Sequence, residues 1–193
     1  MATAAHHGAT AEAGTTTTLL HAAQAGPADL LAADGYIFAA PENLAGLAGV
    51  MKDFFDRCYY PALDRIEGRP YAAMICAGSD GHGAARQLAR ITTGWRLREV
   101  AEPLIICTHA QTPEAILAPK TIAQADLTRC HELGAALAKR WAAFQAAEAL
   151  RKTGQKKEAC EHYHLYMELA SPTAPDRRDS LRAMNELGCP VER

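Results

Sequence analysis

Two short segments rich in small residues carry the groups in this sequence that could do chemistry. The first, Pro41–Gly49, holds a carboxylate at Glu42 and an amide at Asn43. The second, Ala77–Gly83, is glycine-rich, and His82 is its obvious titratable side chain. Small residues let a ligand lie against the backbone, and free N–H groups at the start of a helix can meet electron-rich ligand atoms. Both segments are therefore candidate ligand-binding loops, although such turns are also common structural features and a lone loop histidine is usually a solvated surface residue.

Each of these segments follows an apolar run of strand length. One run lies between Asp34 and Pro41, another covers Tyr71–Ala77, and a third covers Leu104–Thr108. We also expect a strand over Thr15–Ala23, which is β-branched and then apolar. Helices are expected over residues 1–14, 49–58 and 84–98, and from Asp126 onwards. Apolar strands that alternate with helices predict a parallel α/β sheet, in which ligands bind where the carboxyl ends of the strands open into loops.

Composition limits the function classes that need to be considered. The 193 residues are 49% hydrophobic, which excludes global disorder, and 20 Lys+Arg against 22 Asp+Glu give a net charge of −2. We expect no nucleic-acid partner, because such proteins carry a basic patch or stripe. We also expect no membrane partner, because no apolar run approaches the ~18 residues that a spanning helix needs. Residues 1–7 contain no basic-then-apolar secretory signal.

The six cysteines form no Cys-x-x-Cys pair. We therefore predict reduced thiols in a cytoplasmic protein. Cys160 and His164 would share a helix face, but no further ligand cluster accompanies them, so no metal site is predicted.

The composition changes after about Gln145, and we predict two units: an α/β body over residues 1–145 and a charged helical tail over residues 146–193. Within the tail, helices are expected over 158–169 and 179–187, with a linker at 171–175. The run Leu150–Tyr163 resembles part of a tetratricopeptide repeat, although Tyr166 stands where that repeat usually has a small residue. One such repeat cannot bury its own apolar face, so we expect the tail to dock on the body or on a protein partner.

The run Ile37–Asp56 resembles the flavodoxin-like NAD(P)H-dependent FMN reductase and quinone oxidoreductase family. In that family a strand ends in proline, here Pro41, and a short loop passes over the flavin ring. A Gly-x-Met/Leu-Lys/Arg-x-Phe-Leu-Asp helix follows, and here it begins at Gly49. The segment Cys76–Gly83 fits the next flavin-contacting loop of the family. The resemblance covers about residues 15–143.

This resemblance implies a three-layer flavodoxin-like fold with strand order 2-1-3-4-5 and FMN at the switch point. It implies an oxidoreductase that passes electrons from NAD(P)H through FMN to a quinone or a similar small acceptor, and it implies self-association. The residues that would lie along the isoalloxazine ring are Pro41, Glu42, Asn43, Leu44, Ala45 and Gly46. Those that would approach its pyrimidine edge or ribityl chain are Ala77, Gly78, Ser79, Asp80 and Gly81. No catalytic side chain is nominated, because the flavin carries the chemistry.

The sequence departs from the family pattern at its start. A flavodoxin-like chain opens with an apolar strand and a Ser/Thr/Gly-rich loop that grips the FMN phosphate, and residues 1–9 show neither. We therefore expect the first strand to be missing, through a late start site or a degenerating copy, and the Thr15 run to be the second strand. FMN would then bind weakly or not at all, because a phosphate dianion needs those donors. The alternative is a truncated, non-catalytic flavodoxin-like protein with a helical interaction tail.

Overall fold

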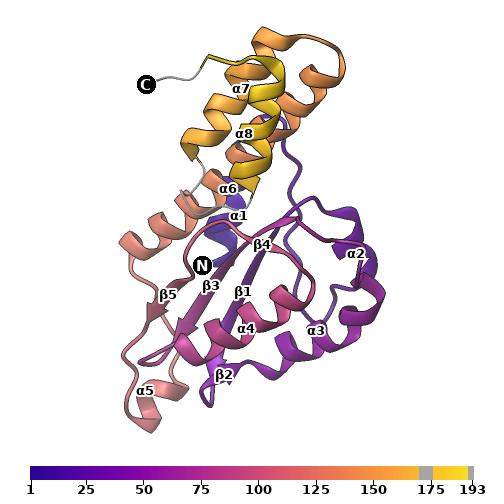
Figure 1. Ribbon diagram of the computed structural model, residues 1–193. Coiled ribbons are helices and arrows are strands. Elements are labelled where there is room, and N and C mark those ends of the chain that lie inside the picture. The colour runs from indigo at the N-terminus through magenta and orange to yellow at the C-terminus, as the bar shows by residue number, and fades with distance from the viewer. Residues whose placement is uncertain (170–175, 191–193) are drawn as a thin grey trace.

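The computed structural model describes residues 1–169 and 176–190 and contains one sheet (Figure 1). Its strands are β1 (Tyr36–Asn43), β2 (Gly46–Leu47), β3 (Pro70–Ala77), β4 (Arg98–Glu99) and β5 (Leu104–Cys107). The order is β2-β1-β3-β4, and β5 also pairs with β3. β4 lies beside the start of β3 and β5 beside its end, so the two short strands share one edge position. All pairs are parallel except the β1–β2 hairpin, which confirms the predicted α/β class.

Helices cover both faces of the sheet and give the three predicted layers (Figure 1). One face carries α1 (Ala2–Thr10) and α6 (Gln124–Lys152); the other carries α2 (Pro27–Ala32), α3 (Gly49–Ala62) and α4 (His82–Gly94). The short helix α5 (Pro113–Leu117) follows β5, and α7 (Lys156–Leu169) and α8 (Asp176–Leu187) stack beside the second half of α6. Among the described residues, no helix is long and apolar enough to cross a membrane.

The helices α1 and α6 cross in close contact because small residues line both. A Cβ added to Gly134 of α6 would lie 1.9 Å from the carbonyl oxygen of Ala5, and one added to Gly8 of α1 would lie 2.0 Å from that of His131. Both glycines are therefore required for the approach of the two backbones. The alanine-rich composition of these helices produces a thin layer on this face of the sheet.

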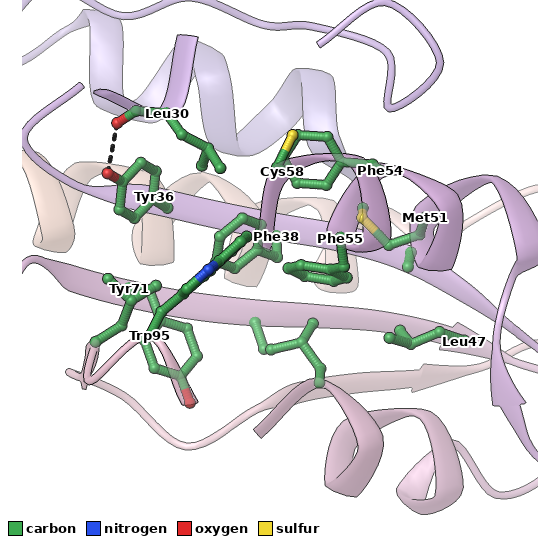
Figure 2. Close-up of a cluster of buried hydrophobic side chains, with 14 of the residues drawn as sticks. Leu30, Tyr36, Phe38, Leu47, Met51, Phe54, Phe55, Cys58, Tyr71 and Trp95 are labelled. Atoms are coloured by element: carbon green, nitrogen blue, oxygen red, sulfur yellow. Dashed lines mark hydrogen bonds between the residues drawn. The ribbon is translucent and has the colours of Figure 1, made fainter. Parts of the chain in front are cut away.

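Most of the aromatic side chains gather on the opposite face, between the sheet and α3 (Figure 2). The rings of Phe38 and Phe55 lie 5.2 Å apart, and those of Phe55 and Trp95 lie 5.5 Å apart. The indole N–H of Trp95 donates to the carbonyl oxygen of Tyr59 at 3.0 Å, so its polar atom is satisfied within the core. The hydroxyl of Tyr36 donates to the carbonyl oxygen of Leu30 at 2.6 Å and attaches α2 to the start of β1.

The strand predicted over Thr15–Ala23 is wrong. Residues 15–20 have no regular secondary structure, and they follow α1 closely. The Thr15 hydroxyl donates to the carbonyl oxygens of Ala9 and Glu12, at 3.0 and 2.7 Å. Such local side-chain bonds compete with strand formation. In the described parts of the chain no strand lies beside this segment, so β-branched composition alone does not produce a ladder here.

The other predicted elements are confirmed, with boundaries shifted by a few residues. The structure adds β2, β4 and α5, which the sequence did not predict. The predicted tail helices are α7 and α8, and the predicted linker at 171–175 lies outside the described residues. The predicted unit boundary at 145 falls within α6, and the division into two units stays a prediction, as does the tetratricopeptide resemblance.

A buried arginine attaches the tail to the body. Arg140 of α6 is only 4% exposed, and its Nη2 donates to the Tyr166 hydroxyl at 3.0 Å. Its guanidinium also lies 5.1 Å from the centre of the Tyr166 ring, and its Nη1 donates to the carbonyl oxygen of Val100 at 3.4 Å. Tyr166 is therefore one of the contacts between α7 and the rest of the molecule, which explains a large residue where the repeat pattern has a small one.

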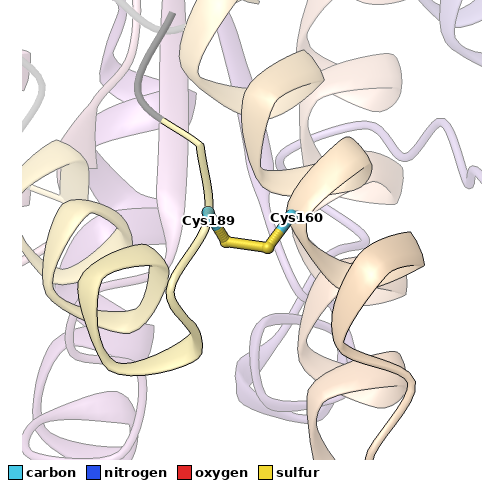
Figure 3. Close-up of a disulfide and its surroundings, with 2 residues drawn as sticks. All are labelled: Cys160 and Cys189. Atoms are coloured by element: carbon cyan, nitrogen blue, oxygen red, sulfur yellow. A yellow bond between two sulfur atoms is a disulfide. The ribbon is translucent and has the colours of Figure 1, made fainter.

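The expectation of six reduced cysteines is wrong, because Cys160 and Cys189 form a disulfide (Figure 3). Gly188, with φ of +73°, turns the chain after α8 and brings Cys189 back towards α7. The two Cα atoms lie 5.4 Å apart, a typical separation for a disulfide. Cys58, Cys76, Cys107 and Cys130 are free. The cytoplasmic location stays a prediction.

The disulfide predicts a redox-dependent stability of the tail. It closes a loop with a sequence separation of 29, which corresponds to about 3–4 kcal/mol on the chain-entropy account. Reduction, or the substitution Cys189→Ser, should lower the free energy of unfolding of the tail by about that amount and expose α8 to limited proteolysis. The variant Cys107→Ser, which keeps the disulfide, should behave as wild type. An unchanged cleavage rate after reduction would contradict this prediction.

Candidate functional site

The candidate site lies where β1, β3 and β5 end, at the carboxyl edge of the parallel sheet (Figure 1). β1 continues into a tight hairpin with β2, in which Asn43 pairs with Gly46. Leu44 and Ala45 form the turn with φ of +51° and +61°, the backbone of a two-residue type I′ turn. The Leu44 side chain projects into solvent and is fully exposed. The predicted loop over the flavin is therefore a structured hairpin.

The Glu42 carboxylate joins this hairpin to the second predicted segment. One carboxylate oxygen accepts the N–H of Gly81 at 2.8 Å, and the other accepts the N–H of Ala84 at 3.2 Å. Gly81 is the N-cap of α4, so a negative charge sits where the helix leaves N–H groups unpaired. Two segments separated by about 40 residues in the sequence thus form one surface, with Glu42 turned towards α4.

Further contacts hold the hairpin against α4. The side-chain oxygen of Gln87 accepts the N–H of Leu47 at 2.8 Å. A Cβ added to Gly83 would lie 2.1 Å from the carbonyl oxygen of Ala45, so the first turn of α4 packs directly on the turn of the hairpin. Gly83 is required by this approach, and the position of the hairpin is fixed at three points.

The loop after β3 is held from its other side by β5. Gly81 has φ of +84°, and a Cβ there would lie 2.5 Å from a methyl group of Ile105, so the position requires glycine. The backbone N–H and the hydroxyl of Thr108 both donate to the carbonyl oxygen of Ala77, at 2.9 and 3.2 Å. The Cys107 thiol contacts the carbonyl oxygen of Asp80 at 3.8 Å.

The segment after β5 also lies at this edge of the sheet, and the sequence analysis did not predict it as part of the site. Thr108 and His109, with φ of +55° at His109, follow β5 beside the loop at 78–81. The signal was present, because the predicted apolar run Leu104–Thr108 must end at the same edge as the other parallel strands. It was missed because the segment carries no glycine cluster.

The predicted site residues differ in what they present to a ligand. The exposed side chains of Asn43, Ser79 and Asp80 have no hydrogen-bond partner among the described residues. Ala77 is buried, Gly46 and Gly78 are partly buried, and Pro41, Leu44 and Ala45 are exposed. The surface therefore offers free amide, hydroxyl and carboxylate groups beside exposed backbone, which suits a flat polar ligand.

Cys76, near the end of β3, is a partly buried thiol of the site. Burial raises the pKa of the Cys76 thiol, and the nearby α-amino group partly opposes that rise. The thiol is therefore neutral near pH 7 and is a weak nucleophile there. Among the described residues no group of three His, Cys, Asp or Glu side chains is placed to hold a metal ion.

Comparison with known families identifies the body of the chain. The model of the NADPH-dependent FMN reductase family matches residues 5–112, which is more than half of the chain. The chain belongs to this family. The match spans both loops of the candidate site. No curated protein matches this FMN reductase family member significantly.

One solved structure supports the flavodoxin-like fold of this chain. A flavodoxin from the domain Archaea superposes with a TM-score of 0.56 at 14% identity, covering 72% of this chain and 85% of the other. A flavodoxin, WrbA-like protein from Agrobacterium tumefaciens gives a TM-score of 0.46 at 19% identity, covering 70% of this chain and 83% of the other. At these identities the first comparison shows the fold alone.

The residues at the edge fit the ring of the FMN that the family name implies. A flavin ring carries several hydrogen-bond acceptors and one N–H donor. The free polar groups of Asn43, Ser79 and Asp80, together with the glycine-rich backbone beside them, can pair with these atoms. The start of α4 offers the FMN phosphate fewer free N–H donors, because Gly81 and Ala84 already donate to the Glu42 carboxylate.

We call the two hydrogen bonds from Gly81 and Ala84 to the Glu42 carboxylate the Glu42 bridge. Removal of this carboxylate should lower the stability of the protein. Glu42→Ala should lower the free energy of unfolding by about 1–3 kcal/mol, because two charge-assisted hydrogen bonds are lost and the N–H groups of Gly81 and Ala84 lose their acceptor. Urea unfolding measures the change. The exposed Glu132 of α6 gives a matched control, and Glu132→Ala should stay within about 0.5 kcal/mol of wild type. Equal stability of the two variants would show that the bridge is not formed.

Proposed function

We propose that this chain binds FMN against the hairpin at 41–46 and the loop at 77–81, and passes electrons from NAD(P)H to a quinone or a similar small acceptor. The observation that carries the proposal is the Glu42 bridge, which makes one surface from the two segments that the family resemblance nominated. The exposure of Asn43 and Leu44 supports access of a small acceptor to a ring held there.

In this proposal the protein binds and orients the ring. The Asn43 amide and the backbone of residues 78–80 supply hydrogen bonds to its polar edge, and the hairpin turn limits its position from the side of β1. FMN held there would supply the hydride acceptor and the route of the electrons to the small acceptor. No side chain at the site is assigned a proton-transfer role, because none is needed for hydride transfer to the ring.

We further propose that FMN is held mainly by its ring and weakly by its phosphate. A phosphate dianion is usually bound at a helix N-terminus or in a nest of backbone N–H groups. At α4 the N–H groups of Gly81 and Ala84 are already bonded to Glu42, and the negative charge of Glu42 repels a second anion. This arrangement supports weak FMN binding.

A comparison of FMN with riboflavin tests this proposal directly. Titration of each flavin with the full chain, followed by flavin fluorescence, should give dissociation constants in the micromolar range or above. The two values should agree within about threefold, since the phosphate contributes little. FMN binding about a hundredfold tighter than riboflavin would contradict weak phosphate capture, and no binding of either flavin would favour the non-catalytic alternative.

Turnover is tested separately. With added FMN, wild type and Glu132→Ala should oxidise NADPH in the presence of a small quinone. Glu42→Ala should lose about tenfold or more in rate at subsaturating flavin, equivalent to about 1.4 kcal/mol, because the two loops lose their fixed relation. Assays on protein that is shown by circular dichroism to be folded separate this loss from unfolding. Full activity of Glu42→Ala would contradict the proposed site.

A further inference from the structure

The exposed face of α4 carries a row of basic side chains. His82, Arg86 and Arg90 are exposed and stand four residues apart, so they fall within an arc of about 80° on one side of the helix. The helix itself contains no Asp or Glu. Neither arginine has a hydrogen bond or an ion pair with any residue that the structure describes. α4 therefore presents to solvent a positively charged strip made of these three residues, which we call the α4 basic strip.

Other arginines around the sheet have partners within the chain. Arg57 and Arg96 form ion pairs with nearby carboxylates, and Arg69 donates to carbonyl oxygens around the end of α2. Like charges four residues apart on a helix repel each other. For Arg86 and Arg90 no carboxylate among the described residues offsets this repulsion. An anion from outside the chain would offset it.

The α4 basic strip begins at the candidate site and runs away from it. Gly81, the N-cap of α4, belongs to the loop that we propose contacts the flavin ring. At a rise of 1.5 Å per residue, Arg86 lies about 8 Å and Arg90 about 14 Å beyond Gly81 along the helix axis. α4 forms part of the outer layer on its face of the sheet (Figure 1). A long ligand with one end at the flavin site can therefore lay its other end along the strip.

The chemistry of the strip suits a phosphate monoester. A guanidinium group binds phosphate oxygens with two parallel hydrogen bonds, and two such groups on one face can hold a dianion from two sides. The Glu42 carboxylate already accepts the N–H groups of Gly81 and Ala84, so an anion at α4 meets the arginine side chains instead of the helix start. NADPH carries such a group, the 2′-phosphate on its adenosine ribose, and NADH lacks it.

We propose that Arg86 and Arg90 bind the 2′-phosphate of NADPH and make this chain select NADPH over NADH. The nicotinamide would lie against a flavin held at 41–46 and 77–81, and the adenosine end would lie over the second and third turns of α4. The place of the nicotinamide rests on the proposed function, which supplies a cosubstrate whose phosphorylated form matches the charge of the strip. The phosphate site itself can be tested without flavin.

Nucleotide binding to the flavin-free full chain tests the phosphate site. The probe is adenosine 2′,5′-bisphosphate, titrated in a calorimeter. Its controls are 5′-AMP, which lacks the 2′-phosphate, and 5′-ADP, which carries both phosphates on the 5′ oxygen. The bisphosphate should bind about tenfold or more tightly than either control. Equal affinities would indicate general charge attraction, and this result or no binding of the bisphosphate would overturn the proposal.

A double variant locates the phosphate site. Arg86→Gln combined with Arg90→Gln should fold as wild type, because both side chains are exposed. It should lower the affinity for the bisphosphate about tenfold or more and remove the advantage over 5′-ADP. Arg65→Ala removes an exposed arginine elsewhere on the molecule and should keep the wild-type affinity. Unchanged affinity in the folded double variant would overturn the proposal. If this variant does not fold, the comparison of the three nucleotides on wild type decides.

Two other occupants of the strip would give different results. If the double variant weakened the binding of FMN but not of riboflavin, the arginines would hold the flavin phosphate. If a peptide of about eight glutamates bound more tightly than the bisphosphate, and lost this affinity in the double variant, the strip would serve an acidic protein partner. Either result would overturn the proposal.

Turnover tests the consequence for the cosubstrate. The ratio of kcat/KM for NADPH to that for NADH should be about ten or more in wild type and Arg65→Ala, and should fall about tenfold in the double variant. An unchanged ratio would overturn the proposal. Flavin fluorescence separates this inference from the proposed function. A chain that binds the bisphosphate but no flavin supports the phosphate site and contradicts the proposed function, whereas a chain that binds flavin but no bisphosphate overturns the inference alone.

Discussion

The carboxyl edge of this sheet depends on one side chain, the Glu42 carboxylate. Parallel strands bring their ends to a common edge, but the loops that follow them are not bonded to each other by the ladder itself. Glu42 supplies that bond by accepting two N–H groups from the start of α4, and Gln87 and Gly83 then let the hairpin lie directly on the helix. A surface for a flat ligand exists because the two loops are held in a fixed relation.

The same bond limits what the edge can bind. A helix N-terminus is an anion site when its N–H groups are free, and at α4 an internal anion already uses two of them. The family match points to FMN chemistry, and we propose that the local electrostatics favour contact with the ring over contact with the phosphate. Affinity for the cofactor should therefore follow the quality of the ring contacts, and membership of the family alone does not set it.

Local sequence patterns were enough to predict the elements that carry the site. The apolar run before Gly78 is a strand buried on both faces, and the run before Pro41 is a strand buried on one face and partly buried on the other. The glycine-rich ends of both runs mark the loops. The turn at Leu44 and Ala45 was not predictable as a hairpin, because neither residue is typical of a type I′ turn. The pairing of Glu42 with Gly81 depends on tertiary approach across 39 positions, and no local pattern encodes it. The pairing of Cys160 with Cys189 likewise depends on tertiary approach, and no local pattern encodes it. The strand predicted over Thr15–Ala23 does not form, because strand propensity is realised only beside a partner strand.

The most direct test of the proposed site is residue-resolved flavin binding followed by nuclear magnetic resonance. Riboflavin is added to the isotopically labelled chain, and the backbone amide signals are recorded during the titration. The proposed site predicts that the largest shifts fall on residues 43–46 and 78–81, with smaller shifts after β5 at Thr108 and His109. Shifts confined to residues outside these segments, or no shifts at saturating flavin, would contradict it.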